Sequence, residues 1–192
     1  MQKRGSKFEE ARDEAAFYGP KIDIQMKNVN GKEDTAFTVQ YDFCMPDRFD
    51  LNYIGEDGAN HRAFVVHRSS IGAIERIMAF LIEKYGGAFP LWLSPVQARV
   101  LPVSEKHNAY AQEVLAALRA ANIRADVDDA NESLGKKIRN AKTEKIPYLL
   151  VVGDKEVEVK TVSVDSRDHG KLDSLSVSDF VNRATEEITR RG

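Results

Sequence analysis

The spacing of apolar residues changes near Pro95 and divides this 192-residue chain into two parts. Before Pro95, short segments alternate apolar and polar residues, which is typical of half-buried antiparallel strands. After it, short apolar runs alternate with stretches of helical spacing, which indicates an α/β sheet with parallel strand pairs. We therefore expect two pieces, residues 1–88 and residues 89–192. The first is short for an independent domain and is expected to be incomplete.

The first piece is predicted to hold a β-hairpin and one long helix. Lys21–Met26 reads as a strand, Asn30-Gly31 as the turn, and Phe37–Phe43 as the returning strand. A helix is expected over Ile71–Tyr85, ending at Gly86-Gly87. The other predictions are an irregular segment over Pro46–Gly58, strands over Ala63–His67, Ala98–Val103, Ile123–Val127, Tyr148–Val152 and Val157–Val164, and helices over Ala109–Ala121, Ser133–Thr143 and Ser178–Arg190.

Composition excludes several classes of protein. The net charge of −2 gives no global nucleic-acid signature, so nucleic-acid binding would need a local basic patch. A single cysteine, Cys44, rules out an internal disulfide and is compatible with a reducing compartment. Every apolar run is too short to span a membrane, and we expect a cytoplasmic protein. No P-loop, dinucleotide-binding, zinc-protease or paired-cysteine motif occurs.

Four polar or flexible positions in the first piece could carry chemistry. Arg76, near the start of a helix, could place its guanidinium on phosphate oxygens, and Gly72 would allow a ring or backbone to approach closely. Thr38 and Gln40 share one strand face and could bind a small polar substrate. The alternative is that Arg76 pairs with Glu75 or another neighbour and that the strand face is merely solvated.

Consecutive blocks of the chain resemble the threonyl-tRNA synthetase family of class II aminoacyl-tRNA synthetases. Their order and spacing match from about Ala16 to the C-terminus, and Gly72–Arg76 matches class II motif 3. The matching blocks are Tyr18–Asp23, Thr38–Phe43, Tyr53–Asp57, His67–Arg76 and Ala88–Gln97.

The resemblance implies an enzyme that activates threonine with ATP and Mg²⁺ to threonyl-adenylate and then transfers it to threonine tRNA. Arg76 matches the motif 3 arginine that contacts an ATP phosphate. Gln40 and Thr38 match positions near the adenylate and threonine. Tyr18 and Lys21 match residues that line the site.

The resemblance also implies that His67 is one of three zinc ligands, although a lone histidine on a strand is more often structural. The family's zinc takes the amino and hydroxyl groups of threonine and so rejects valine. Its other two ligands, and class II motifs 1 and 2, have no counterpart here, and Cys44 is not at a ligand position. We expect a homodimeric, zinc-containing complete enzyme and an inactive fragment that does not hold zinc.

The second piece resembles the anticodon-binding domain of class II synthetases. Asn131 and Glu156 match positions that read anticodon bases by hydrogen bonds. Basic residues around one predicted helix could meet phosphates, or could be a solvated helix face. These residues are Lys136, Lys137, Arg139, Lys142 and Lys145.

Three departures from the family put local geometry in question. Asp165 stands where the family tends to have an arginine, and a carboxylate there would repel RNA. Arg167, two residues on, could substitute. Asp13–Ala16 replaces a glycine-rich stretch, and Ala36-Phe37 stands where the family usually has a glycine.

The sequence therefore favours the C-terminal part of a threonine–tRNA ligase: the end of a class II antiparallel sheet with its motif 3 helix, then an α/β anticodon-binding domain with a mixed sheet flanked by helices. One alternative is a stand-alone tRNA anticodon-binding module without catalysis. An unrelated α/β binding domain would require all of the blocks to be coincidental. Prolyl, histidyl and glycyl synthetases are closer rivals.

Overall fold

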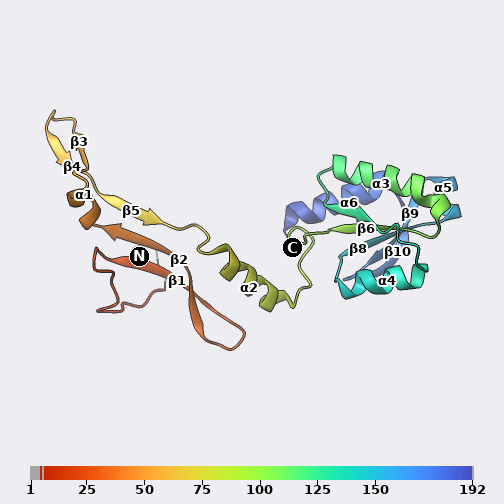
Figure 1. Ribbon diagram of the computed structural model, residues 1–192, viewed down its shortest axis with the longest axis horizontal. Coiled ribbons are helices and arrows are strands. Elements are labelled where there is room, and N and C mark those ends of the chain that lie inside the picture. The colour runs from red at the N-terminus through yellow and green to blue at the C-terminus, as the bar shows by residue number, and fades with distance from the viewer. Residues whose placement is uncertain (1–4, 6, 192) are drawn as a thin grey trace. The chain divides into compact units, whose positions relative to one another are not determined.

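The computed structural model describes residue 5 and residues 7–191 (Figure 1). The chain separates into two compact units, Met1–Lys84 and Tyr85–Gly192. The first unit is built on a small antiparallel sheet and the second on a larger mixed sheet with helices on both faces.

The main sheet of the first unit has the strand order β1-β2-β5, and all of its pairs are antiparallel. The strands are β1 (Lys21–Lys27), β2 (Glu33–Asp42) and β5 (Val65–Arg68). The Asn28 side chain closes the β1–β2 turn by accepting hydrogen bonds from backbone N–H groups, and Gly31 adopts a φ of +77° there. The predicted hairpin is confirmed, because an Asn-Gly turn suits tightly connected strands.

The segment expected to be irregular is partly ordered into short elements. It contains α1 (Cys44–Arg48) and β3 (Asn52–Ile54), and β3 pairs with β4 (Asn60–Arg62) as a two-stranded hairpin. Their polar sequences gave no periodic signal, so the prediction was wrong here. The predicted long helix is present as α2 (Ile74–Tyr85).

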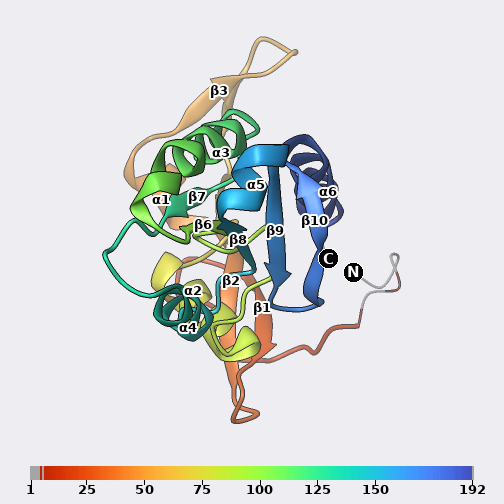
Figure 2. The same cartoon turned by 90° about the vertical axis from the view of Figure 1, so that its right-hand side faces the viewer.

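The second unit holds a five-stranded sheet in the order β10-β9-β8-β6-β7, which Figure 2 shows after a turn of 90° from Figure 1. Three neighbouring strands are parallel: β6 (Ala98–Pro102), β8 (Tyr148–Val152) and the edge strand β7 (Ala125–Val127). The last two, β9 (Thr161–Ser166) and β10 (Gly170–Ser176), are antiparallel to their neighbours. The mixed α/β fold class predicted from the sequence is therefore confirmed.

Helices cover both faces of this sheet. In Figure 1, α3 (Asn108–Ala120) and α6 (Val177–Arg190) lie on one face and α4 (Leu134–Thr143) on the other. The main apolar core lies on the α3 and α6 side, where Phe180 packs edge-on against Tyr148 with ring centroids 5.3 Å apart. A smaller core that includes Leu101 and Ala141 lies under α4. A short 3-10 helix, η2 (Glu105–His107), leads into α3.

Two elements near the C-terminus differ from the prediction. The expected strand over Val157–Val164 begins as a helix, α5 (Asp154–Val159), and strand β9 starts only at Thr161. The Glu156 carboxylate accepts a hydrogen bond from the Gly153 N–H, which caps the helix start and overrides the β-branched valines. Strand β10 was not predicted, because its sequence is mostly polar and it forms the edge of the sheet.

The two units differ sharply in how well they bury apolar residues. In the described part of the first unit, only Ala36, Pro46 and Phe80 are buried aliphatic or aromatic residues, whereas the second unit has a large cluster of buried apolar side chains. Many large apolar side chains of the first unit are exposed; Phe17, Ile54, Phe64 and Ile74 are examples. Within residues 5 and 7–191, we find no helix with the length and apolar character needed to cross a membrane.

Candidate functional site

One face of the first unit's sheet brings together four of the predicted site residues. Strand register places Gln40 opposite Lys21 on β1 and opposite His67 on β5. The Tyr18 hydroxyl donates a hydrogen bond of 2.6 Å to Oε1 of Gln40. The Tyr18 ring also meets the His67 ring edge-on, at a centroid distance of 6.3 Å. The result is a continuous polar strip across three strands.

Thr38 extends this strip, because residues two apart on a strand share a face. Its register partner on β1 is Asp23, and Asp23 accepts an ion pair of 2.8 Å from the Lys21 ammonium group. The hydrogen bond and the charge of Asp23 raise the pKa of Lys21. An anionic ligand would have to replace Asp23 as the partner of Lys21, while the neutral groups of the strip suit a hydroxyl-bearing ligand.

Asp42 fixes the orientation of His67. Its Oδ2 lies 2.9 Å from Nε2 of His67, while its Oδ1 accepts hydrogen bonds from the backbone N–H groups of Cys44 and Met45. The Met45 N–H, followed by His67, lowers the pKa of Asp42. The Nδ1 atom of His67 has no hydrogen bond to any described residue, so it is the ring nitrogen left for another ligand.

His67 and Asp42 do not amount to a metal site. Among residues 5 and 7–191, no three histidine, cysteine, aspartate or glutamate side chains lie close enough together to hold a metal ion. One imidazole bound to a carboxylate is too few ligands for a tetrahedral zinc ion. The residues of this chain alone therefore do not fit the zinc ion that the sequence resemblance implied.

The predicted motif 3 residues pack against β2. Gly72 has a φ of +73°, and a Cβ atom there would lie 2.0 Å from the Ala36 carbonyl oxygen, so a side chain cannot be accommodated. Arg76, in the first turn of α2, donates a 2.7 Å hydrogen bond from Nη1 to the Thr35 carbonyl oxygen. No bond from its other guanidinium nitrogens to a described residue occurs, and the side chain is exposed.

In the second unit, the predicted RNA-reading residues gather at the carboxyl ends of the parallel strands. Strand β7 lies on one side of β6 and β8 on the other, so the strand order reverses between β6 and β8. Open α/β sheets bind ligands at such a topological switch point. Glu156 follows β8, in the first turn of α5, and Asn131 lies in the loop between β7 and α4. Asn131 is exposed and makes no side-chain hydrogen bond to a described residue.

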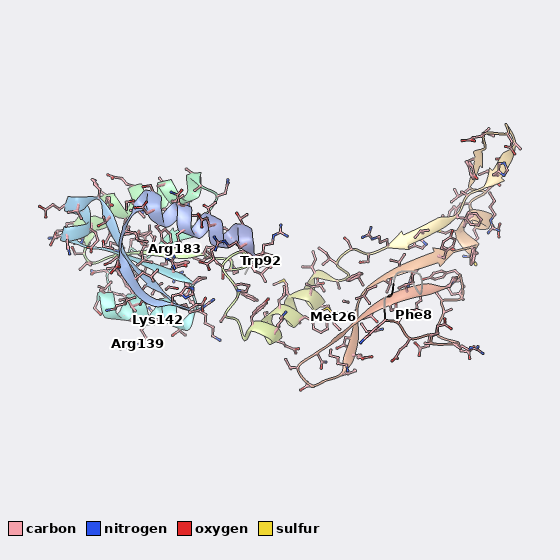
Figure 3. All side chains as sticks on the ribbon, turned by 180° about the vertical axis from the view of Figure 1, so that it is seen from behind. Phe8, Met26, Trp92, Arg139, Lys142 and Arg183 are labelled. Carbon is pink, nitrogen blue, oxygen red and sulfur yellow. The ribbon has the colours of Figure 1, made fainter. Side chains whose placement is uncertain are left out.

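The predicted basic cluster around α4 separates into residues with different surroundings. Lys136 pairs with Glu132 at 2.7 Å, while Arg139 has no ion pair within the described chain. Arg139 and Lys142 both project from α4 in Figure 3. Lys145 instead donates to the carbonyl oxygen of Gly86, and Lys137 is buried. The cluster is therefore not one uniform phosphate-binding face.

Asp165 is not a bare carboxylate. It forms an ion pair of 2.9 Å with Lys142, and only 16% of its side chain is exposed. Arg167, the suggested substitute, donates to Asp168 and to the carbonyl oxygens of Lys145 and Phe89. Its guanidinium group thus holds the segment around Phe89, which precedes β6. Contact between Arg167 and RNA would require some of these hydrogen bonds to break.

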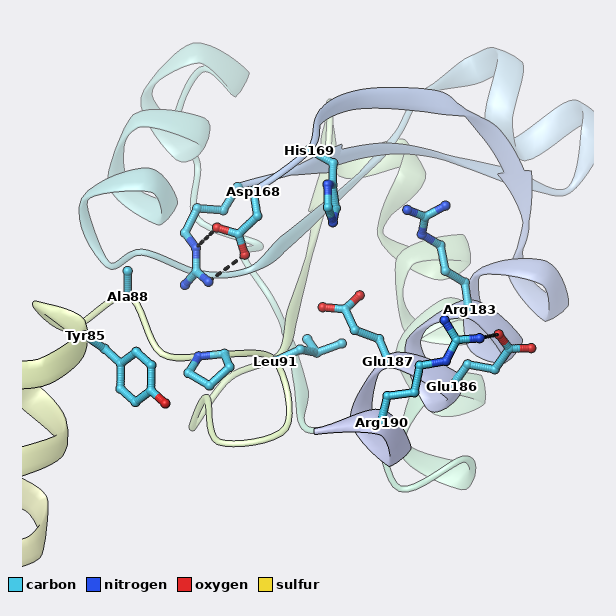
Figure 4. A pocket seen from close by; sticks show the side chains of 11 residues that line it. Tyr85, Ala88, Leu91, Asp168, His169, Arg183, Glu186, Glu187 and Arg190 are labelled. Carbon is cyan, nitrogen blue, oxygen red and sulfur yellow. Dashed lines mark hydrogen bonds and ion pairs between the residues drawn. The ribbon is translucent and has the colours of Figure 1, made fainter. Parts of the chain in front are cut away.

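A cleft of the second unit lies at the opposite end of the sheet from Asn131 and Glu156. Figure 4 shows residues 85–91, the turn after β9, and α6 around a volume of about 700 Å³. Its charged groups largely satisfy one another: Arg190 pairs with Glu186, Arg167 pairs with Asp168, and Glu187 accepts from the Tyr148 hydroxyl. This neutralised lining does not indicate a ligand.

Comparison with known proteins decides between the possible families. Residues 3–85 match the model for the tRNA synthetase class II core domain (G, H, P, S and T), and residues 97–187 match the model for an anticodon binding domain. The chain is 54% identical over 184 residues to a threonine–tRNA ligase of Clostridium perfringens, a match that covers 96% of this chain. It belongs to the threonyl-tRNA synthetase family.

The match corresponds to the C-terminal part of that family. The chain spans only 29% of the length of the Clostridium perfringens ligase, and 30% of that of a Natranaerobius thermophilus threonine–tRNA ligase to which it is 48% identical. Its fold is similar to the RNA binding domain of threonyl-tRNA synthetase from Cryptosporidium parvum, with a TM-score of 0.87 and 32% identity. That superposition covers 97% of this chain and 47% of the other.

A more distant structure supports the fold alone. The chain superimposes on a prolyl-tRNA synthetase of Cryptosporidium parvum with a TM-score of 0.68 at 19% identity, covering 95% of this chain and 41% of the other. Nothing in the sequence indicated that three polar residues, Asp42, His107 and Lys137, are buried, and Lys137 was expected to meet phosphates at the surface. Burial is unusual for these residue types and cannot be read from a strand or helix pattern.

Proposed function

We propose that this chain supplies the motif 3 side of the catalytic site, and the anticodon-binding domain, of a threonine–tRNA ligase. Residues 1–88 would belong to the catalytic domain and residues 89–192 to the tRNA-binding domain. The observation that carries the proposal is the polar strip of Lys21, Gln40 and His67 across three strands, which Tyr18 joins from the preceding turn. The two halves of the chain match a class II core and an anticodon binding domain.

In this proposal, the first unit helps to form threonyl-adenylate from threonine and ATP. Arg76 stabilises charge on the ATP phosphates, with Mg²⁺ bound to the nucleotide, and Gly72 allows close approach. Gln40 and Thr38 hydrogen-bond the adenylate and threonine, and Tyr18 orients the Gln40 amide. Lys21 leaves Asp23 to meet an anionic group of the ligand. His67 offers one zinc ligand to a site completed elsewhere in the enzyme.

The exposed apolar surface of the first unit supports a composite active site. A unit with so few buried apolar residues lacks a core of its own, and an apolar patch of this kind is normally covered by protein. The relatives have more than twice as much additional chain, so we propose that the remainder of a class II catalytic domain covers it. A cytoplasmic homodimer is the complete assembly that we infer.

The experiment is ATP–pyrophosphate exchange with threonine. This chain alone should be inactive, and mixing or co-expressing it with the upstream part of a relative, such as the Clostridium perfringens ligase, should give exchange. An Arg76→Ala variant is the control, since it should complement structurally but reduce exchange by roughly 100-fold or more. Failure of every upstream part to restore exchange, despite stable association, would reject the catalytic assignment.

The alternative function is a tRNA anticodon-binding module without catalysis. It is favoured by one observation: the second unit has a complete core, whereas the first does not. Low-salt binding to threonine tRNA, compared with the same tRNA carrying a replaced anticodon, tests this function. Discrimination without complementation would favour the module, and neither discrimination nor complementation would reject both functions.

A further inference from the structure

Lys137 is a buried cation with no carboxylate partner in the described chain. Only 4% of the residue is exposed. Its Nζ donates to the carbonyl oxygens of Asp128, at 2.9 Å, and Pro102, at 3.3 Å. Burial of a charged group costs free energy, and backbone carbonyls compensate for it only in part.

The position of Lys137 within its helix adds to this cost. It is the fourth residue of α4, close to the N-terminal end, where the helix dipole favours anions rather than cations. A lysine that is both buried and placed near a helix N-terminus is expected to be there because it holds another segment of the chain. The hydrogen bonds of Lys137 identify the segments that it holds.

The ammonium group joins three segments at the carboxyl ends of the parallel strands. Pro102 ends β6, Asp128 follows β7, and Lys137 itself belongs to α4. The Asp128 N–H also donates to the Val100 carbonyl oxygen, so Asp128 is held on both sides. These bonds fix the start of the loop that carries Asn131.

The other end of the same loop is fixed by α4. The Lys137 N–H donates to the Ser133 carbonyl oxygen, and Glu132 is held by Lys136 and Asn140. Asn131 is therefore an exposed residue, with no side-chain partner in the described chain, of a short loop that is secured at both ends. An amide that hydrogen-bonds a base needs such support, because a mobile loop would lose conformational entropy when it became ordered on binding RNA, and this would lower the affinity.

We propose that Lys137 is a positioning residue for RNA recognition: its buried ammonium group holds the Asp128–Ser133 loop so that Asn131 presents its amide to a base. The proposal rests on the proposed function of the second unit. It differs from the prediction that Lys137 meets phosphates directly, because a buried ammonium group cannot reach a phosphate without leaving its two carbonyls.

Three variants of the 192-residue chain test this role. Lys137→Met keeps the length and apolar stem but removes the charge and donors, and Lys137→Arg keeps a charged donor. Arg139→Met is the matched control, because it removes an exposed cation of the same helix that makes no side-chain contact with a described residue and does not hold the loop. The measurement is affinity for threonine tRNA and for the same tRNA with its anticodon replaced.

We expect Lys137→Met to lower the preference for the correct anticodon roughly tenfold, the worth of one well-placed hydrogen bond. Lys137→Arg should recover part of that preference. Arg139→Met should weaken binding of both tRNAs equally, since a phosphate or surface contact carries no base information. Hydrogen exchange at residues 129–132 should accelerate only in Lys137→Met.

The outcomes separate the possible failures. If the wild-type chain does not discriminate between the two tRNAs, the proposed RNA-reading function fails, and the role of Lys137 fails with it. If the wild type discriminates and a folded Lys137→Met keeps the same preference, Lys137 is only a structural residue. Should Lys137→Met not fold, Lys137→Gln serves instead, and an unchanged preference there overturns the proposal equally.

Discussion

At the scale of single residues, the contacts of Asp165 change what its sequence position suggests. A carboxylate beside an RNA loop should be repulsive, but the ion pair with Lys142 neutralises it within the protein. The pair also uses Lys142, which would otherwise be a free cation on α4. The carboxylate that was expected to repel RNA and the lysine that was expected to attract it therefore neutralise each other in the structure.

A double-mutant cycle tests this neutralisation. Lys142→Ala should weaken RNA binding more in the wild-type background than in Asp165→Asn, because only the former leaves an unpaired carboxylate. We expect a coupling of about 0.5–1 kcal/mol, typical of a partly exposed pair. Binding of threonine tRNA at low salt by the four proteins gives the measurement. Equal effects of Lys142→Ala in both backgrounds would show that Asp165 does not act on the RNA.

The bond from Tyr18 to Gln40 gives a second prediction at this scale. Tyr18→Phe removes the hydroxyl that donates to Oε1 of Gln40, which frees the amide to rotate. Exchange activity of the complemented enzyme should fall roughly fivefold, since one positioning hydrogen bond is worth about 1 kcal/mol. Tyr53→Phe is the control and should leave exchange unaltered, because it removes a hydroxyl that has no hydrogen bond to a described residue and keeps the exposed ring. An unimpaired Tyr18→Phe enzyme would show that Gln40 is oriented by other contacts.

At the scale of elements, the sequence predicted structure best where periodicity and stop signals agree. The β1–β2 hairpin, α2 and the central strands of the second unit follow from alternation, an Asn-Gly turn and paired glycines. Short polar elements such as β4 and β10 gave no such signal, since they depend on pairing with a neighbouring strand.

The candidate site was predictable to a similar degree and for related reasons. The face shared by Thr38 and Gln40 follows from strand alternation alone. The meeting of Tyr18, Gln40 and His67 depends on the β2–β5 register, which links residues far apart in sequence. Roles for individual residues came from family resemblance, while the buried partners Asp42 and Lys137 required the tertiary structure.

The start of α5 provides a prediction about pH. The pKa of Asp154 lies below its usual value of 3.8, because His107 donates a hydrogen bond to its carboxylate and Lys106 lies beside it. In the unfolded chain this pKa returns to about 3.8. The carboxylate therefore stabilises the fold fully above pH 3.8, and this stabilisation is lost as the pH falls through the lower folded-state pKa.

Asp154→Asn should consequently be less stable than the wild type at pH 7, and the difference should shrink as the pH falls below about 3.8. Urea midpoints of the second unit at pH 7, 5, 4 and 3 measure this change. Asp173→Asn is the control, because Asp173 is exposed and has no ion pair with a described residue. A difference between Asp154→Asn and the wild type that stays constant down to pH 3 would contradict the assigned role of the ion pair.

At the scale of the whole molecule, the two units should differ in their ability to fold alone. The second unit surrounds its sheet with packed helices on both faces, while the first leaves most of its large apolar side chains in solvent. Burial of apolar area is the main favourable term in folding. A unit that lacks it depends on polypeptide from elsewhere, which is consistent with a chain that spans 29% of a relative's length.

Separate fragments test this difference directly. Residues 85–192 should unfold in one cooperative urea transition, with a free energy of unfolding of roughly 5–10 kcal/mol. Residues 1–84 should bind a hydrophobic dye and unfold without a sharp transition, because exposed apolar surface replaces a core. Addition of an upstream catalytic-domain polypeptide should suppress dye binding and produce a cooperative transition. A cooperative transition of residues 1–84 alone, without dye binding, would mean that this unit is self-sufficient and that its apolar face needs no covering partner.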